Sequence, residues 1–417
     1  MPYPFLIAAK KNKEIFDIPG YIACGMSGNC IIPLSVGDLI PLPKQSRLFF
    51  LPDRYPVAFD PGPGQIQPLK EFYPVAAFLP PGYTGLSCAA YQERAGARVL
   101  PLFSYAAVAL YKGKYYVAAT LIDRHKKHDL SSVDWHVLKN KINFFKGRSN
   151  RLIRHLAVCA LKNCCPNAVN FFLGKFECPL PSSRLCNARC IGCISFQPRY
   201  SCPATQERLK FAPTAQELAE IALIHIRRAK NPIVSFGQGC EGEPLLSGKA
   251  IVEAIKAIRG QTQLGTIHMN TNASLPGEVR NLCVSGLDSM RVSLNSARRG
   301  LYKQYYQPKG YSFDDVVRSI AIAKKNKKFV SLNYLVMPGF TDEYEEFREL
   351  VAFIRNTGID MIQWRNLNFD PLRYFAKMKI IAPRELLGVN TVINQLRSEF
   401  PGLKHGYFNL SKEDFVK

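Results

Sequence analysis

Three cysteines stand close together near the middle of the chain, in the stretch Leu185-Cys186-Asn187-Ala188-Arg189-Cys190-Ile191-Gly192-Cys193. Their C-x3-C-x2-C spacing supplies three soft thiolates in one short loop, whereas a four-iron cluster takes one thiolate for each iron. The pattern predicts an iron–sulfur site at Cys186, Cys190 and Cys193, with one iron left open to bind another molecule. The alternatives are a structural zinc loop and three unrelated thiols. Zinc usually takes four ligands in C-x2-C pairs, and this spacing is unsymmetrical.

This spacing resembles the signature of the radical S-adenosylmethionine (radical SAM) superfamily. The resemblance implies a [4Fe–4S] cluster whose open iron holds the amino and carboxylate groups of S-adenosylmethionine. It also implies an electron transfer that cleaves this cofactor to a 5′-deoxyadenosyl radical. The chain departs from the family at Gly192, because the residue before the third cysteine is usually aromatic and packs near the adenine. We expect another side chain to take that place, with Ile194 and Phe196 as candidates.

From Cys186 onward, short apolar runs alternate with amphipathic stretches, which predicts right-handed βα units around a parallel sheet. The predicted strands are Ile233–Phe236, Thr266–Asn270, Ser289–Leu294, Phe329–Val336 and Met361–Leu367. The predicted helices are Gln216–Arg228, Lys249–Arg259, Glu278–Val284, Phe313–Lys325 and Tyr344–Asn356. With one more strand just before Cys186, the pattern is similar to the partial (β/α)6 barrel of radical SAM enzymes. In such a barrel, loops at the carboxyl ends of the strands carry the chemistry.

Glycine and polar residues follow the predicted strands. Gly242-Glu243-Pro244 resembles the family's Gly-Gly-Glu-Pro stretch, which implies that the backbone at Gly242 and the region of Glu243 hold the cofactor's amino group. The alternative is a glycine-rich turn with a proline at a helix start. Side chains alternate between the two faces of a strand, so Arg291, Ser293 and Asn295 share one face at the end of the predicted strand Ser289–Leu294. From that face they could bond the ribose and the carboxylate of S-adenosylmethionine. The other residues predicted to contact the cofactor are Asn270, Arg291, Ser293, Asn295 and Met337.

The end of the sixth predicted strand is unusually polar for a buried segment. Four residues there are predicted to face the substrate as catalytic residues: Arg365, Asn366, Asn368 and Asp370. The alternative is the ordinary polarity of a solvated loop.

A second group of cysteines precedes the signature loop, with His155 nearby. These residues form a candidate auxiliary metal site, expected to be a second Fe–S cluster: Cys159, Cys164, Cys165 and Cys178. Cys202 is a candidate further ligand. Buried thiols without a metal are the alternative, since adjacent cysteines rarely both bind one cluster.

The amino-acid composition restricts the kinds of protein that this chain could be. The chain has 417 residues, of which 47% are hydrophobic and 21% charged, so a sizeable core is expected. No stretch approaches the roughly 18 apolar residues of a membrane span, and no signal peptide is evident, which predicts a cytoplasmic protein without a membrane partner. The net charge of +23 fits an anionic partner. Residues 124–162 contain ten Lys and Arg but only two Asp, with aromatic residues interleaved. This segment could bind nucleic acid, or it could be a solvated helix.

We predict four regions along the chain. Residues 1–130 form a small mostly-β domain, with strands expected at Asn29–Leu34, Arg47–Leu51, Val99–Phe103 and Tyr115–Leu121. Residues 131–179 form a basic, cysteine-rich linker, residues 180–371 the barrel, and residues 372–417 a helical extension that includes a helix over 384–399.

The expected function is that of a radical SAM enzyme that abstracts hydrogen from an unidentified substrate: RNA, protein or a small anionic metabolite. The expected partner is a low-potential electron donor, a ferredoxin or flavodoxin. Gly242–Leu246 also resembles the radical RNA methyltransferases, but the lack of a cysteine after Cys283 argues against their mechanism. The alternative from another class is a non-catalytic Fe–S or zinc protein that binds nucleic acid through the basic segment.

Overall fold

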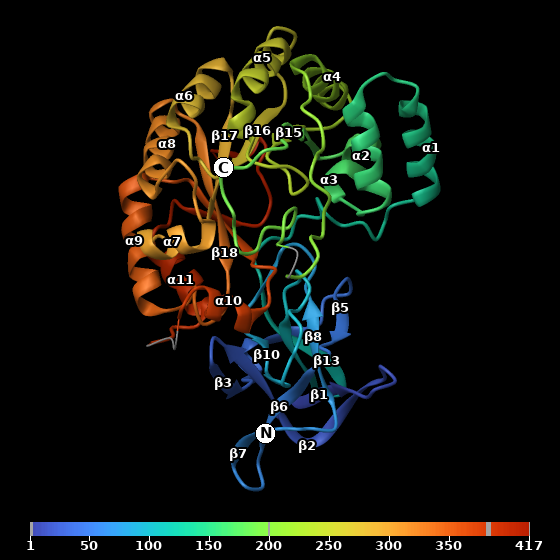
Figure 1. Cartoon of the computed structure of the whole chain (residues 1–417), viewed down its shortest axis with the longest axis vertical. Helices are drawn as coiled ribbons and strands as arrows, with labels where there is room; N and C mark the ends of the chain where they lie inside the picture. Colours follow the sequence, from blue (N-terminus) through green and yellow to red (C-terminus); the bar gives the residue numbers. More distant parts are fainter. Residues whose placement is uncertain (1–2, 199–200, 381–384, 417) are drawn as a thin grey trace.

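The structure is a computed structural model, and it describes residues 3–198, 201–380 and 385–416, without the side chain of Lys146. Two parts lie end to end along the longest axis (Figure 1). One part is a parallel sheet with helices along its outer side, and the other is a smaller antiparallel β domain formed by the N-terminal residues.

The N-terminal domain is a sheet of thirteen described strands, with the central order β11-β6-β2-β1-β8-β12-β13-β4. Its strands are β1 (Phe5–Ala9), β2 (Ile15–Ser27), β3 (Cys30–Pro33), β4 (Leu39–Pro41), β5 (Arg47–Phe50), β6 (Arg54–Asp60), β7 (Gln65–Pro68), β8 (Tyr73–Phe78), β9 (Tyr83–Gly85), β10 (Cys88–Ala89), β11 (Tyr91–Glu93), β12 (Ala106–Tyr111) and β13 (Lys114–Leu121). The turn between β12 and β13 places Lys112 and Gly113 at φ 48° and 69°, as a tight hairpin requires. Val99–Phe103, predicted as a strand, forms none.

The second sheet is parallel and contains seven described strands in chain order. They are β14 (Glu177–Pro179), β15 (Ile233–Phe236), β16 (Thr266–Thr271), β17 (Ser289–Leu294), β18 (Phe329–Val336), β19 (Met361–Asn366) and β20 (Lys404–Gly406). The helices and 3-10 turns of this part are α4 (Ala215–Ile226), η2 (Pro244–Ser247), α5 (Gly248–Arg259), α6 (Pro276–Ser285), α7 (Arg299–Tyr306), α8 (Phe313–Lys325), α9 (Tyr344–Thr357), α10 (Pro371–Lys377), α11 (Val389–Glu399) and η3 (Lys412–Asp414). The molecule therefore combines a parallel half-barrel with a mostly-β domain.

The predicted strands of this sheet agree with the observed ones to within one residue at each end. The strand expected just before Cys186 is β14. Helix α7 was not predicted, and β20 is a strand in the region expected to be helical. Arg384, the predicted start of the last helix, lies outside the described residues, and α11 begins at Val389.

The basic, cysteine-rich segment folds into three helices beside the parallel sheet (Figure 1). They are α1 (Trp135–Lys146), α2 (Arg151–Leu161) and α3 (Pro166–Leu173). No single described helix is long and apolar enough to cross a membrane. The pair α2 and α3 passes such a test by length and composition, but the two are bent by 119° and both bury side chains in the protein core.

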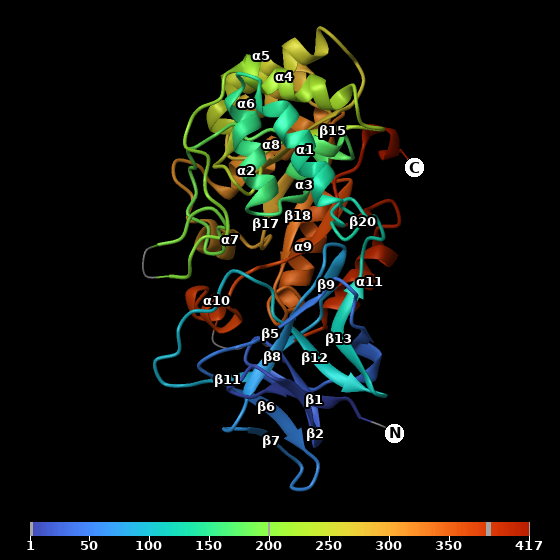
Figure 2. The same cartoon turned by 90° about the vertical axis from the view of Figure 1, so that its right-hand side faces the viewer.

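The two parts of the molecule are joined by direct contacts and share one hydrophobic core. In the view of Figure 2, β9 lies at the junction. Asn366 at the end of β19 accepts a hydrogen bond from Gly85 N (2.9 Å) and donates one to Tyr83 O (2.9 Å). Thr84 Oγ1 donates to Trp364 O at 2.9 Å. The N-terminal domain therefore abuts the carboxyl end of a strand that borders the candidate site.

Candidate functional site

The cysteine loop lies at the carboxyl end of β14, over a cavity of about 400 Å³ that all three cysteines line. The loop is anchored on the last turn of α7, because Arg189 N donates to Tyr306 O (2.8 Å) and Ile191 N donates to Tyr305 O (3.0 Å). A Cβ at Gly192 would lie 2.9 Å from the Tyr305 hydroxyl and 3.0 Å from Leu367 Cδ1. Tyr305 therefore occupies the space that a side chain at position 192 would need.

The spacing of the three sulfur atoms bears on the kind of metal. Among the described residues, the three cysteines are not gathered within 4.8 Å of one another, as the ligands of a single ion would be. A cluster is larger than one ion and holds its ligands farther apart, so the donor set suits a cluster better than a zinc ion. Burial raises the pKa of Cys186, and it raises that of Cys190 well above its ordinary value, with further contributions from the neighbouring thiols. A metal reverses this effect, since a coordinating thiol is deprotonated.

The loop after β15 pairs with the backbone that leads into the cysteine loop. Gly242 N donates to Ser183 O at 2.7 Å, and Glu243 N donates to Leu185 O at 2.8 Å. A Cβ at Gly242 would lie 1.9 Å from Leu185 O, so only glycine permits this approach. The stretch predicted to hold the cofactor's amino group is therefore held directly beside Cys186.

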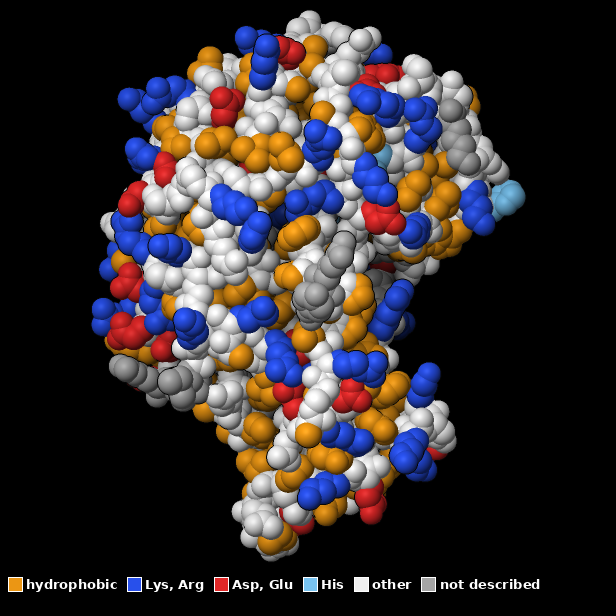
Figure 3. Space-filling model, viewed as in Figure 1, with side chains coloured by type: hydrophobic (Ala, Val, Ile, Leu, Met, Phe, Trp, Pro, Cys, Tyr) orange, Lys and Arg blue, Asp and Glu red, His pale blue; other side chains and the backbone are white. Residues whose placement is uncertain are grey.

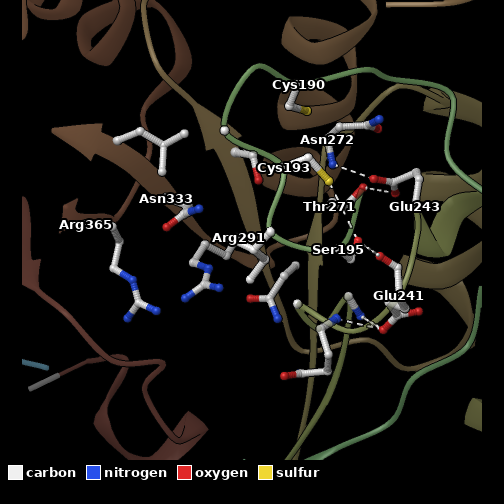
Figure 4. A pocket seen from close by; sticks show the side chains of 18 of the residues that line it. Cys190, Cys193, Ser195, Glu241, Glu243, Thr271, Asn272, Arg291, Asn333 and Arg365 are labelled. Carbon is white, nitrogen blue, oxygen red and sulfur yellow. Dashed lines mark hydrogen bonds between the residues drawn. The ribbon is translucent and has the colours of Figure 1, made fainter. Parts of the chain in front are cut away.

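Glu243 is buried, and its carboxylate is engaged by backbone and side-chain donors. It accepts hydrogen bonds from Leu245 N (3.1 Å), Thr271 Oγ1 (2.5 Å) and Asn272 N (2.8 Å). Burial raises the pKa of Glu243 to about 7, although these hydrogen bonds act in the opposite direction. The side chain connects the start of η2 to the end of β16, and the residue lines the cavity (Figure 4).

Glu241 was not predicted from the sequence, yet it organises the same loop. Its buried carboxylate accepts five hydrogen bonds, from Gly237 N, Gln238 N, Ser182 N, Ser182 Oγ and Ser183 N, at 2.7–2.9 Å. It thus fastens the loop after β15 to the segment before the cysteines.

A second group missed from the sequence is Arg208. Its Nη2 lies 3.6 Å from Cys193 Sγ, and its Nε donates to Ser195 Oγ at 3.2 Å. Arg208 thus contacts both the third cysteine and the residue two positions after it. Of the two side chains proposed to pack the adenine, Ile194 lines the cavity. Phe196 is 51% exposed and lies beneath Arg208.

The predicted cofactor contacts on the strands divide into two sets. Asn270, Arg291 and Ser293 line the cavity together with Gly242 and Glu243. Asn270 is already engaged, since it donates to Phe236 O (3.0 Å) and faces His268 Nε2 (3.0 Å).

Asn295 and Met337 are not among the residues that line this cavity. Asn295 is fully buried. Met337 borders a separate small cavity beside Cys88 and Ala106 of the N-terminal domain.

The far end of the cavity is lined by arginine and amide groups, opposite the cysteines (Figure 4). Arg291 Nη1 donates to Gln363 Oε1 at 2.7 Å, and Arg365 Nη1 donates to Tyr407 O at 2.7 Å. Among the described residues, no carboxylate lies within 4.0 Å of either guanidinium. Burial lowers the pKa of Arg291 to about 9, and the charge of Arg365 lowers it further. Among the described residues, Arg291 Nε and Asn333 Oδ1 have no hydrogen-bond partner. The carboxylate of Glu177 also lines the cavity and acts on the pKa of Arg291 in the opposite direction, so it offsets part of the positive charge at this end.

Of the four predicted substrate-facing residues, Arg365, Asn366 and Asn368 line the cavity. Asn366 does so while it also bonds the β9 backbone. Asp370 lies instead in the junction between the two parts of the molecule, fully buried. It caps the start of α10, and its Oδ2 is 3.0 Å from Arg54 Nη2.

The candidate auxiliary cysteines are not brought together as a group of four. Cys164 is exposed, whereas Cys178 is buried in β14, where its thiol donates to Pro179 O at 3.6 Å. Cys159 lies beside His155 and Cys240 instead. A hydrogen bond with Cys240 lowers the pKa of Cys159 to about 5 against the effect of burial, and His155 lowers it further. Cys202 is buried, and Ser201 Oγ donates to its sulfur at 3.8 Å.

Comparison with known proteins finds matches to parts of this chain. The model of the Radical SAM superfamily matches residues 180–351. Over 228 residues, the chain is 25% identical to "Molybdenum cofactor biosynthesis protein 1" of Drosophila melanogaster, which covers 54% of this chain and 37% of that protein. Over 118 residues, it is 27% identical to the "Probable dual-specificity RNA methyltransferase RlmN" of Gloeobacter violaceus, which covers 27% of this chain and 34% of that protein. The matched stretch thus spans little more than a third of each curated relative.

Two solved structures also match this chain, at low sequence identity. Methylornithine synthase (PylB) matches with a TM-score of 0.39 and 17% identity, covering 67% of this chain and 76% of that one. Streptococcus suis SuiB bound to the precursor peptide SuiA matches with a TM-score of 0.41 and 17% identity, covering 61% and 52%.

Proposed function

Because residues 180–351 form a domain of the radical SAM superfamily, we propose that this chain is an enzyme that reductively cleaves S-adenosylmethionine and abstracts hydrogen from a substrate with an anionic group. Cys186, Cys190 and Cys193 would hold the [4Fe–4S] cluster. When bound together, the cluster and S-adenosylmethionine supply a 5′-deoxyadenosyl radical. We take β14–β19 as the six strands of a partial (β/α)6 barrel, with β20 added at its edge.

The observation that carries this proposal is the pairing of Gly242 and Glu243 with Ser183 and Leu185. It keeps backbone groups of the glycine stretch within reach of an amino group bound near Cys186. Ser293 on β17 and Asn270 on β16 would contact other polar parts of the cofactor from the barrel interior. The role of the chain is to bind and orient both groups and to exclude water.

The substrate class follows from the charge at the far end of the cavity. Within the described part of the chain, Arg291 and Arg365 form no ion pair with a carboxylate closer than 4.0 Å, and each guanidinium can bind a carboxylate or phosphate through two donors. A small anionic metabolite fits this arrangement most simply. An RNA or protein substrate would present a phosphate or carboxylate to the same arginines. Its dock would then be the open groove on α1, which Lys141, Arg148 and the 77% exposed Phe144 line.

The electron donor we propose is a ferredoxin or flavodoxin. Such donors are acidic proteins, and the chain carries 55 Lys and Arg against 32 Asp and Glu. On the face shown in Figure 3, basic side chains are scattered over both parts of the molecule rather than gathered in one patch.

Formation of 5′-deoxyadenosine tests the proposed function. Anaerobically reconstituted protein, given S-adenosylmethionine and a strong reductant, should form this product and bind about four irons per chain. Cys190→Ala should form none, whereas Cys283→Ala removes a buried thiol on α6 and should retain the activity. An intact, reducible cluster that forms no 5′-deoxyadenosine would favour the non-catalytic alternative.

The anion-binding role of the arginines has a separate test. Replacement of Arg365 by methionine should weaken binding of inorganic pyrophosphate by about 10- to 100-fold, because a hydrogen bond to a charged group contributes roughly 1.5–3 kcal/mol. Isothermal titration of the full chain measures this. Arg299→Met, which removes an exposed arginine paired with Asp314, is the matched control and should bind as the wild type does. Equal affinity in all three proteins would place anion binding elsewhere.

A further inference from the structure

A second group of metal-ligating side chains lies outside the cavity described above. His155 Nε2 is 3.5 Å from Cys159 Sγ and 3.5 Å from Cys240 Sγ, and all three atoms lie within 4.8 Å of one another. Among the residues that the structure describes, this is the single group of three such ligands gathered so closely. The two thiols are 3% and 4% exposed, so the group is closed to bulk solvent on most sides.

The fold sets these positions through separate elements. His155 and Cys159 are four residues apart on α2, so they share one face of the helix a single turn apart. Cys240 belongs to the loop after β15. Leu209 N donates to Cys240 O at 2.7 Å, and the five hydrogen bonds of the Glu241 carboxylate fix the next residue. The backbone of α2 and of the loop after β15 therefore holds His155, Cys159 and Cys240 close together.

The distances agree with those within one tetrahedral metal site. Zinc–sulfur bonds of about 2.3 Å and zinc–nitrogen bonds of about 2.0–2.1 Å, at the tetrahedral angle, place sulfur and nitrogen ligands about 3.5 Å apart. Both observed sulfur–nitrogen distances have this value. Two thiolates and one imidazole are a donor set that zinc prefers, and water can fill the fourth position.

We propose that His155, Cys159 and Cys240 bind one zinc ion, at a site separate from that of Cys186, Cys190 and Cys193. This site differs from the four-cysteine auxiliary cluster predicted from the sequence, because it uses only Cys159 of that set and adds Cys240. It joins α2 to the loop that carries Gly242 and Glu243. The ion would therefore fasten that loop to α2.

A disulfide is the competing outcome, since the sulfurs of Cys159 and Cys240 lie within 4.8 Å. Reconstituted, anaerobically purified full-length protein should contain one zinc per chain in addition to its iron. A second measurement uses the Cys186/Cys190/Cys193→Ala variant, which removes the competing thiols. Titration of this variant with Co²⁺ should give thiolate charge-transfer absorption that saturates at one ion per chain.

Single substitutions in that background identify the ligands. Cys159→Ser, Cys240→Ser and His155→Gln should each weaken Co²⁺ binding by at least about 100-fold, because loss of even an outer-shell partner costs about 10- to 100-fold. Cys283→Ser should leave the affinity unchanged. His155 is only half-buried, so His155→Gln remains informative if a cysteine variant does not fold. The proposal is overturned by absence of zinc and Co²⁺ binding, by undiminished binding in all three variants, or by a Cys159–Cys240 disulfide in the purified protein.

Discussion

Gly242→Ala should weaken S-adenosylmethionine binding by about 10- to 100-fold and reduce the iron content of the reconstituted protein. The added Cβ would lie 1.9 Å from Leu185 O and 3.1 Å from Cys186 N, and neither backbone atom can move aside without displacing the cysteine loop. Overpacking of this kind costs about 1–3 kcal/mol, and each 1.4 kcal/mol is tenfold in affinity. Equilibrium dialysis of S-adenosylmethionine, together with iron analysis, measures both effects.

The same loop offers a matched control. A Cβ at Gly239 would lie 2.6 Å from Ile194 Cδ1, which is the end of a flexible side chain rather than backbone. Gly239→Ala should therefore change the affinity by only a few-fold. If both variants bind S-adenosylmethionine as tightly as the wild type, the loop after β15 does not hold this cofactor, and the residue-level part of the proposed function is wrong.

The parallel sheet could be predicted because its strands are short runs with apolar residues at alternate positions, separated by amphipathic helical stretches. Ser289–Leu294 and Phe329–Val336 are such runs, and both strands have the predicted bounds. Helix α7 could not be recognised in this way. Its buried side chains are Tyr302, Tyr305 and Tyr306, and tyrosine does not give the clear aliphatic periodicity of an amphipathic helix.

The candidate site shows the same division between local and distant information. The three cysteines and the Gly242-Glu243-Pro244 stretch are local patterns, so their positions around one cavity could be anticipated. Glu241 bonds Ser182, which is 59 positions away, and His155 meets Cys240 across 85 positions. No spacing rule joins such residues.

Asp370 is a case in which the sequence suggested a role that its surroundings do not favour. A polar strand end is expected to face a ligand, and Asp370 was predicted to face the substrate on that ground. The carboxylate instead accepts hydrogen bonds from Arg54 Nη2 (3.0 Å), Leu100 N (3.0 Å) and Tyr91 Oη (3.2 Å). Arg54 and Leu100 lie 316 and 270 positions away, so the sequence held no local sign of the junction.

Replacement of Asp370 by alanine should therefore lower the free energy of unfolding by about 3–5 kcal/mol, because it leaves a buried guanidinium without one of its partners. Arg54 is fully buried, and its second carboxylate, Glu93, is 22% exposed, so Glu93 cannot fully compensate the charge. Urea-induced unfolding of the full chain, followed by circular dichroism, gives the free energy. The change should be the same with or without S-adenosylmethionine, since Asp370 does not line the cavity.

Glu14→Ala is the matched control for this prediction. Glu14 pairs with Lys10 at 3.3 Å in the same domain, but their side chains are 55% and 52% exposed, so its loss should leave the free energy of unfolding nearly unchanged. If the Asp370→Ala protein keeps the wild-type free energy of unfolding but loses enzymatic turnover, Asp370 belongs to the substrate site. Loss of stability with unchanged cofactor affinity would instead assign Asp370 to the junction, where it holds the N-terminal domain against the end of β19. The substrate-facing set would then be Arg365, Asn366 and Asn368, which line the cavity.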